Sequence, residues 1–197
     1  MRLATFALLV GLLGASSAAA QTVGDCSRIE ADGSRTLCHE LVVPASGPEV
    51  WALLSTSEGL RSWVAPVAAI DLRVGGLWEA SYDASAQLGD AGNIHNRILS
   101  YLPERMLSIK AERAPPGFPH AELLSGLWSV IELEAVEGVG TRVRVSGVGY
   151  RDGAGYTQLY EMFSAGNTLT LQRLHQRVTH GPLDWPRQLA GREAAQP

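Results

Sequence analysis

Side chains that could take part in acid–base chemistry lie in three separate segments of the chain. The groups that could exchange a proton or orient a reacting group are His95, Asn96, His120, Tyr156, Tyr160 and Glu161. In the first segment, strand alternation places Asn96 on one face with Ile94 and Ile98, and His95 on the opposite face. If the Asn96 face lines a cavity, His95 is a surface histidine, and Asn96 either orients a ligand or bonds to the backbone.

Metal ligands and nucleophiles are not indicated by any spacing in the sequence. The histidines are spread along the chain without an H-x-x-x-H or H-E-x-x-H pattern, at His39, His95, His120, His175 and His180. The nucleophile motif G-x-S-x-G is missing, because Ser125-Gly126 lacks the preceding glycine. We therefore expect no metal, no cofactor and no catalytic residue set, although a Ser-His-Asp set assembled only by folding stays open.

Aromatic side chains give the remaining indication of a ligand site. Six of them could converge beneath one long helix and form an apolar wall with polar tips: Trp63, Trp78, Tyr82, Tyr156, Tyr160 and Phe163. A glycine near the middle of that helix, Gly166, costs about 1 kcal/mol relative to alanine, so it indicates a close backbone approach or room for a ligand. With Asn96 and Ile98 these residues form the predicted site. The alternative for each aromatic residue is that it fills the core.

The long helix is predicted from Tyr156 to about His180. Its apolar residues recur at spacings of three, four and their sums, as on one face of an amphipathic helix: Leu159, Met162, Phe163, Leu169, Leu174 and Val178. Gly181 followed by Pro182 is a typical stop signal. A helix of roughly 35–40 Å needs a broad apolar partner, and the preceding chain offers strands rather than other long helices.

The partner is predicted to be one curved antiparallel sheet of six or seven strands, which makes the fold α+β. The strands are expected at residues 37–43, 70–74, 77–82, 93–101, 106–112, 128–136 and 141–149. Gly75-Gly76 would join the second and third strands in a tight hairpin. Two short helices, the first opened by Ser46 and Pro48 and the second near residues 58–64, follow the first strand. Alternation turns four residues of the last two strands inward: Ile131, Leu133, Val143 and Val145.

Cys26 and Cys38, the two cysteines of the chain, both lie near its beginning. A three-residue loop at residues 31–33, with Gly33 in a left-handed conformation, would place the two cysteines opposite each other in a hairpin. Paired cysteines in an exported protein form a disulfide by default. We therefore predict a Cys26–Cys38 disulfide.

The first twenty residues have the composition of a secretory signal peptide. Arg2 precedes an apolar run from Leu3 to Leu13, and small residues then form an A-x-A pattern that predicts cleavage after Ala20. The run is too short to span a bilayer, so we expect a periplasmic or secreted protein without a stable membrane anchor. Cleavage would remove Arg2 and change the formal net charge from −4 to −5. This charge and the scattered basic residues argue against nucleic acid as a partner.

Five segments between residues 37 and 178 carry family patterns. They are Val42-Val43-Pro44-Ala45 with Pro48-Glu49-Val50-Trp51, then Trp63, Ile70–Trp78 with its Gly-Gly-x-Trp pattern, Ile98–Leu107 with Pro-Glu-Arg-x-Leu, and Gly140-Thr141-Arg142-Val143. Together they resemble the START/Bet v 1-like (SRPBCC) superfamily, specifically its Hsp90-ATPase-activator-like (AHSA1-type) branch. The resemblance implies a helix-grip fold, in which a curved antiparallel sheet grips the long helix around an apolar cavity. It implies no single chemistry, because such cavities serve carriers, cyclases, hydrolases and co-chaperones.

Three functions agree with these observations. The leading hypothesis is an exported binding protein that holds a small hydrophobic or aromatic molecule between the sheet and the helix. The alternatives are a cofactor-free acid–base enzyme of the cyclase, isomerase or hydrolase type acting in the same cavity, and a co-chaperone-like interaction module. The predicted organisation is a signal peptide at 1–20, a disulfide-linked hairpin segment at 21–36, the helix-grip domain at 37–180 and a C-terminal tail at 181–197.

Overall fold

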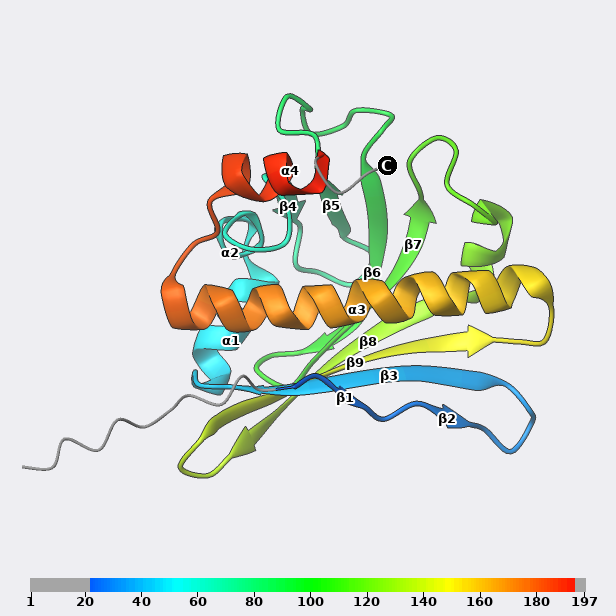
Figure 1. The fold of residues 1–197 in the computed structure, drawn as a ribbon, viewed down its shortest axis with the longest axis horizontal. Helices are drawn as coiled ribbons and strands as arrows, with labels where there is room; N and C mark the ends of the chain where they lie inside the picture. The colour runs from blue at the N-terminus through cyan, green and yellow to red at the C-terminus, as the bar shows by residue number, and fades with distance from the viewer. Residues whose placement is uncertain (1–21, 194–197) are drawn as a thin grey trace, which may run out of the picture.

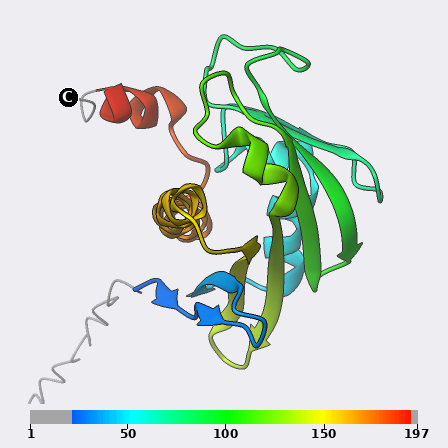
Figure 2. The same ribbon diagram turned by 90° about the vertical axis from the view of Figure 1, so that its right-hand side faces the viewer.

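The computed structural model describes residues 22–193, and of residues 191–193 only the backbone. The predicted signal peptide, residues 1–20, lies outside the described residues. The described chain forms one large antiparallel sheet that curves around the long helix α3, Ala154–His180 (Figure 1, Figure 2). This arrangement confirms the predicted α+β helix-grip fold.

The sheet has nine strands rather than six or seven, because two short strands of the N-terminal hairpin segment also pair with it. The spatial order is β1-β3-β9-β8-β7-β6-β5-β4, and β2 also pairs with β3. The strands are β1 Gly24–Asp25, β2 Arg28–Ile29, β3 Arg35–Val43, β4 Val67–Ile70, β5 Leu77–Ser81, β6 Ile94–Leu102, β7 Met106–Arg113, β8 Trp128–Val136 and β9 Gly140–Tyr150.

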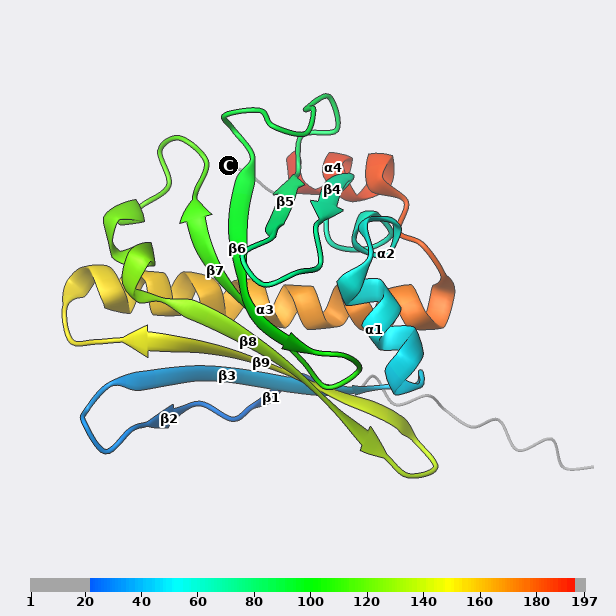
Figure 3. The ribbon, with the colours of Figure 1, turned by 180° about the vertical axis from the view of Figure 1, so that it is seen from behind.

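Two short helices follow β3, as predicted: α1 Gly47–Ser55 and α2 Ser57–Arg61. At the start of α1 the Glu49 carboxylate accepts hydrogen bonds from the Ser46 hydroxyl and backbone N–H, at 2.6 and 2.8 Å. Figure 3 shows both helices near the end of the molecule where α3 ends. The 3-10 helix η1, Ala121–Gly126, lies between β7 and β8, and the helix α4, Trp185–Glu193, follows α3.

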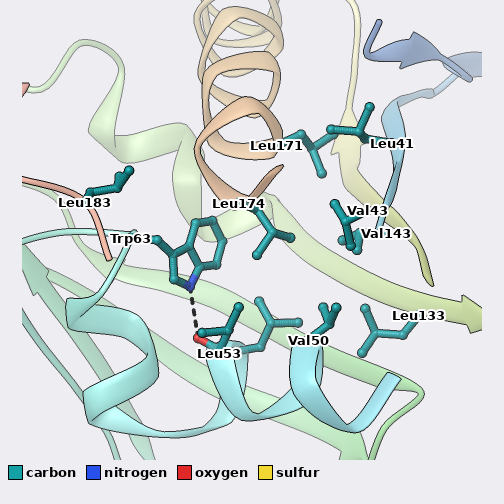
Figure 4. Packing of buried hydrophobic residues seen from close by; sticks show 11 residues of the cluster. Leu41, Val43, Val50, Leu53, Trp63, Leu133, Val143, Leu171, Leu174 and Leu183 are labelled. Atoms are coloured by element: carbon teal, nitrogen blue, oxygen red, sulfur yellow. Dashed lines mark hydrogen bonds between the residues drawn. The ribbon is translucent and has the colours of Figure 1, made fainter. Parts of the chain in front are cut away.

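Cross-strand pairing determines which face of the sheet meets α3. Leu41 of β3 pairs with Val143 of β9, and both are buried in one cluster with Leu171 and Leu174 of α3 (Figure 4). The four residues predicted to point inward from β8 and β9 belong to the same cluster: Ile131, Leu133, Val143 and Val145. The strand alternation therefore identified the core face correctly.

The N-terminal hairpin forms as predicted. Arg28 pairs with Thr36, and the loop between them contains Gly33 at a φ of 83°. This register brings Cys26 opposite Cys38, and the two form a disulfide. The predicted disulfide is confirmed, and it attaches the segment before β3 to the sheet.

Two local predictions are wrong. Strand β4 ends at Ile70 and does not continue to residue 74, because residues 71–76 form a turn in which Gly75 donates to the Ile98 carbonyl and Gly76 accepts from the Ile98 N–H. On α3, Leu169 is 45% exposed, whereas Leu171 is buried. Spacing alone shows that a helix has an apolar face but does not fix how that face is turned toward the sheet.

The chain after α3 packs on the domain. Leu183 is buried in the core cluster, and its backbone N–H donates to the Ser62 carbonyl at 2.9 Å. The indole N–H of Trp185 donates to the Arg61 carbonyl at 2.6 Å. These contacts attach the start of α4 to α2. Among residues 22–193, no helix is long and apolar enough to cross a membrane.

Candidate ligand-binding site

A small, partly open cavity of about 70 Å³ lies between α3, the sheet and the loop that contains η1. The apolar part of its wall is formed by Ala111, Leu124, Leu127, Trp128, Gly147 and Phe163. The polar part is formed by four uncharged residues, Asn96, Ser129, Tyr150 and Asn167. The wall thus resembles a ligand pocket in composition, being mainly apolar with a few polar groups.

Four adjacent strands and one face of α3 position these side chains. Asn96 of β6 pairs with Ala111 of β7, and Ser129 of β8 pairs with Gly147 of β9, so both pairs project from the same face of the sheet. On the opposite wall, Phe163 and Asn167 lie one helical turn apart on α3.

The four polar side chains have no hydrogen-bond partner among the residues that the structure describes. The Ser108 hydroxyl donates to the backbone carbonyl of Ser129, at 3.2 Å, and not to its side chain. The Asn96 amide is therefore not bonded to the backbone, which was one of its two alternatives. Their polar atoms are accessible to solvent rather than sealed in the core, so the four groups are available to a molecule in the cavity.

Tyr150 is 2% exposed, and this burial raises the pKa of its hydroxyl far above the usual range. Its ring meets the Tyr160 ring edge-on, with the ring centres 5.2 Å apart. Gly147 leaves room for it, because a Cβ at that position would lie 3.1 Å from the Tyr150 ring. Tyr150 therefore presents a protonated hydroxyl to the cavity at neutral pH.

The loop from Ala114 to Leu127, which we call the lid, closes one side of the cavity through Leu124 and Leu127. The backbone hydrogen bonds in the turns of the lid join residues that are near in sequence, such as the one from the Phe118 N–H to the Pro115 carbonyl at 3.1 Å. The contacts between the lid and α3 that the structure describes are made by side chains, including Phe118, whose ring centre is 6.2 Å from that of Phe163. Apart from these contacts, the lid backbone at Gly126 lies against β9, where a Cβ on Gly149 would be 2.2 Å from the Gly126 oxygen.

His120 and Gly155 join the lid to the first turns of α3. The His120 Nε2 lies 2.8 Å from the Gln158 Oε1, and His120 itself has a left-handed backbone with φ 52° and ψ 37°. A Cβ on Gly155 would lie 2.9 Å from a Leu123 methyl carbon and 3.1 Å from the His120 Nδ1. The absence of a side chain at Gly155 therefore lets the lid rest on α3.

Two of the nine predicted site residues, Asn96 and Phe163, line the cavity. Tyr156 and Tyr160 lie in the hydrophobic cluster around it, packed near Leu159, without lining it. The remaining five lie elsewhere in the fold: Trp63, Trp78, Tyr82, Ile98 and Gly166.

Those five residues have identifiable surroundings. Trp63 is a core residue whose indole N–H donates to the Leu53 carbonyl at 3.0 Å (Figure 4). Trp78 and Tyr82 pack into a separate cluster near β4 and β5, and Ile98 is buried in β6. The single wall of six aromatic residues expected from the sequence is therefore divided among three clusters.

Gly166 is exposed, and a Cβ built on it would meet no described atom within 4 Å. This excludes a close backbone approach as the reason for the glycine. On the same face of α3, seven residues later, Arg173 is buried, and its guanidinium lies 5.8 Å from the ring centres of Tyr82 and Trp185. No pattern in the sequence indicates a role for this arginine.

His95 points away from the cavity, as predicted, but it is covered by a polar cluster on the outer face of the sheet. The buried Glu79 carboxylate accepts hydrogen bonds at 2.6 Å from the Gly89 N–H and the Asn93 amide, and the His95 Nε2 lies 3.2 Å away. Burial would raise the pKa of Glu79, but these hydrogen bonds hold it below its usual range. The cluster stabilises the loop between β5 and β6, and it lies on the face of the sheet opposite to the cavity.

Three cavity residues continue sequence patterns that were recognised for their neighbours. Asn167 lies four residues after Phe163, and Ser129 and Gly147 continue the inward-facing series already recognised on β8 and β9. No periodic pattern in the sequence indicates that Leu124 and Leu127 line the cavity, because these two lid residues lie in no strand and no long helix.

Solved structures share this fold at low sequence identity. The Aha1 dimer from Colwellia psychrerythraea is 17% identical with a TM-score of 0.60, covering 74% of this chain and 97% of that chain. CalU16 from Micromonospora echinospora is 19% identical with a TM-score of 0.56, covering 88% and 93%. The AHSA1-like protein from Aeromonas hydrophila is 16% identical with a TM-score of 0.53, covering 73% and 91%. Similarity at these identities shows the fold alone.

The curated proteins contain no significant match to this chain. A model of the family described as Activator of Hsp90 ATPase homolog 1-like protein matches residues 44–179, which is more than half of the chain and includes every cavity-lining residue. The match confirms the resemblance found in the sequence and supports a ligand-binding or co-chaperone-like module. The chain therefore belongs to the Activator of Hsp90 ATPase homolog 1-like (AHSA1-like) family.

Proposed function

We propose that the protein binds a small molecule with a hydrophobic or aromatic body in the cavity between the sheet and α3. The observation that carries this proposal is the composition of the wall, in which four polar side chains without a described hydrogen-bond partner stand among apolar ones. Ligand pockets typically combine a mainly apolar lining with a few polar groups that orient the ligand.

Entry of a ring-sized ligand requires the lid to move outward. The cavity has a volume of about 70 Å³, whereas an apolar cavity known to bind benzene measures roughly 150 Å³. The lid contacts α3 through side chains, so its displacement leaves the hydrogen bonds of the sheet intact. Such displacement of a covering loop is a common route of ligand entry.

Binding is better supported than acid–base catalysis. Of the six residues considered for that chemistry, Asn96 is the one found in the cavity wall, and an amide does not titrate. Tyr150 is the single titratable residue in the wall, and its raised pKa keeps it protonated. A protonated tyrosine donates a hydrogen bond but supplies no base at neutral pH.

We further propose that the protein works after export, in the periplasm or outside the cell. The composition of residues 1–20 and the disulfide between Cys26 and Cys38 both support an oxidising compartment. This location argues against a co-chaperone role, because Hsp90-type ATPases work where ATP is available.

A cavity-filling substitution tests the proposed site. Ala111→Leu enlarges a side chain of β7 that lines the cavity, whereas Lys110→Leu places the same side chain on the opposite face of that strand. Each variant and the wild type are titrated with benzene, phenol and indole, and binding is followed by NMR. We expect the wild type and Lys110→Leu to bind at least one probe with shifts at Phe163, and Ala111→Leu to lose that binding while its circular dichroism is unchanged.

Two results contradict the proposal. The first is a wild-type protein in which none of the three probes at millimolar concentration shifts the signals of Phe163 or Asn167. The second is a folded Ala111→Leu protein that binds every probe as well as the wild type does.

A further inference from the structure

The polar groups of the cavity wall also restrict the chemistry of its ligand. We propose that the ligand is uncharged and carries a hydroxyl, carbonyl or amide group on its apolar body. This inference rests on the proposed function, because it concerns the ligand of the same cavity.

The hydrogen-bonding capacity of the wall comes from opposite sides. Asn96 projects from β6 and Asn167 from α3, and each amide can donate two hydrogen bonds and accept at its oxygen. The Tyr150 hydroxyl, held protonated by its burial, adds a donor, and the Ser129 hydroxyl can either donate or accept. A ligand with one hydroxyl, carbonyl or amide group can therefore satisfy donors and acceptors that the described protein leaves unsatisfied.

No charged residue belongs to the wall that the structure describes. A carboxylate or ammonium group would lose part of its hydration on entering the cavity, and no residue of the wall carries an opposite charge. The Arg35 guanidinium, 4.8 Å from the Tyr160 ring centre, stands outside the wall. Neutral amides and hydroxyls stabilise a neutral polar group at a much smaller desolvation cost. The cavity should therefore reject ions that have the same shape as a neutral ligand.

The apolar residues accommodate the rest of the ligand. Phe163 of α3 faces the space that Leu124 and Leu127 close from the lid. An aromatic ring or a short aliphatic chain fits this environment, because it removes apolar surface from water on both sides.

Two matched pairs of probes test the inference. Benzene and phenol differ by one hydroxyl group, and benzamide and benzoate have nearly the same shape but differ in charge at pH 7. Each probe is titrated into the full-length protein, and the side-chain amide signals of Asn96 and Asn167 are followed by ¹⁵N NMR. We expect phenol to bind roughly five- to tenfold more tightly than benzene, as one hydrogen bond to a neutral partner allows, and benzamide to bind while benzoate does not.

Substitution of the two asparagines tests whether their side-chain amides cause the preference for phenol over benzene. Asn167→Leu removes the amide from α3 with little change of size, and Asn96→Leu does the same on β6. Each should lower the preference for phenol over benzene while benzene itself still binds. Gln172→Leu is the control, because Gln172 is exposed on α3 and lies outside the cavity wall; it should keep the wild-type preference.

The outcomes separate this inference from the proposed function. If benzene binds in the cavity as tightly as phenol, or benzoate as tightly as benzamide, the inference is wrong but the binding site stands. If phenol binds without shifting either amide signal, the polar groups serve ordered water only and the inference is again overturned. If no probe reaches the cavity at all, the proposed function fails together with it.

Discussion

Tyr150 and Glu79 are both buried and ionisable, yet their surroundings favour opposite states of charge. Tyr150 lies among hydrophobic side chains, so burial raises the pKa of its hydroxyl and keeps it neutral. Glu79 accepts hydrogen bonds from Gly89 and Asn93, and these outweigh burial and lower the pKa of its carboxyl group. At the scale of single residues, the surroundings therefore make Tyr150 a neutral hydrogen-bond donor in the cavity. They make Glu79 an ionised acceptor that holds the loop between β5 and β6 in place.

Tyr150→Phe should remove part of the sensitivity of the protein to alkaline pH. Above pH 10 the tyrosine ionises in the unfolded chain but stays protonated in the folded one, because its folded pKa is raised. The wild type should therefore lose up to about 1.4 kcal/mol of unfolding free energy per pH unit from this group as the pH rises. Urea unfolding between pH 8 and 11 measures the two slopes, and equal slopes in both proteins would show that Tyr150 is not protected.

Glu79→Gln should destabilise the protein at neutral pH and reduce its sensitivity to acid. The pKa of Glu79 is lowered, so its contribution is present above the unfolded pKa, near 4.3, and is lost as the pH falls through the folded value. We expect a loss of about 1–3 kcal/mol at pH 7. Glu112→Gln is the control, since the ion pair of Glu112 with Arg97 is partly exposed to solvent and should contribute less to the unfolding free energy. A similar loss in both variants, from urea unfolding at pH 3 to 7, would argue against a special role for Glu79.

At the scale of elements, the lid packs on α3 through side-chain contacts rather than through backbone hydrogen bonds. The contact depends on Gly155, where a Cβ would crowd Leu123 and His120. Gly166 occupies the same helix but faces open space. These two glycines therefore provide a matched test of whether α3 holds the lid in place.

Gly166→Ala should stabilise the protein by about 1 kcal/mol, the usual gain for replacing an interior helix glycine. Gly155→Ala should gain less, because Leu123 and His120 must shift to admit the new methyl group. Amide hydrogen exchange of residues 117–127 should become faster in Gly155→Ala and stay at the wild-type rate in Gly166→Ala. Equal exchange in the two variants would mean that α3 does not control the lid.

At the scale of the whole molecule, both ends of the described chain are attached to the domain. The disulfide between Cys26 and Cys38 links the first strands to β3. At the other end, Leu183 enters the core cluster, and Trp185 bonds to the carbonyl of Arg61. The packed part of the chain therefore extends beyond α3 into the segment predicted to be a tail.

Leu183→Ala should destabilise the protein by about 2–4 kcal/mol, because it removes a side chain that is 7% exposed and leaves a gap in the core. Leu169→Ala makes the same chemical change at a position that is 45% exposed, and it should cost less than about 1 kcal/mol. Urea unfolding measures both values. A loss below 1 kcal/mol for Leu183→Ala would mean that the segment after α3 contributes little to the fold.

The mass of the protein recovered from its own host tests export and the disulfide together. We expect a chain that begins at Gln21, with no thiol available for alkylation before reduction and two afterwards. In the loop-entropy description, a ring with a sequence separation of 12 contributes about 3 kcal/mol, so reduction should also lower the unfolding free energy. A full-length chain from Met1 with two free thiols would contradict the proposed location.

Local patterns in the sequence determined the elements and most of their faces. The three-and-four spacing around Leu159 and Leu174 predicts α3, and alternation predicts the inward side chains of β8 and β9. The loop at Gly33 predicts the register that pairs the two cysteines. These predictions succeed because helix and strand periods and hairpin turns depend on residues that are near one another in the chain.

The tertiary structure alone decided which residues share a cavity. Asn96 and Asn167 meet across it although 70 residues of chain separate them, while Trp63, also predicted for the site, satisfies its indole N–H within the core. The lid contributes Leu124 and Leu127 from a segment without any periodic pattern. Sequence periodicity shows which face of an element is buried, but the distance between two faces depends on long-range packing, and that distance determines whether a side chain fills the core or lines a cavity.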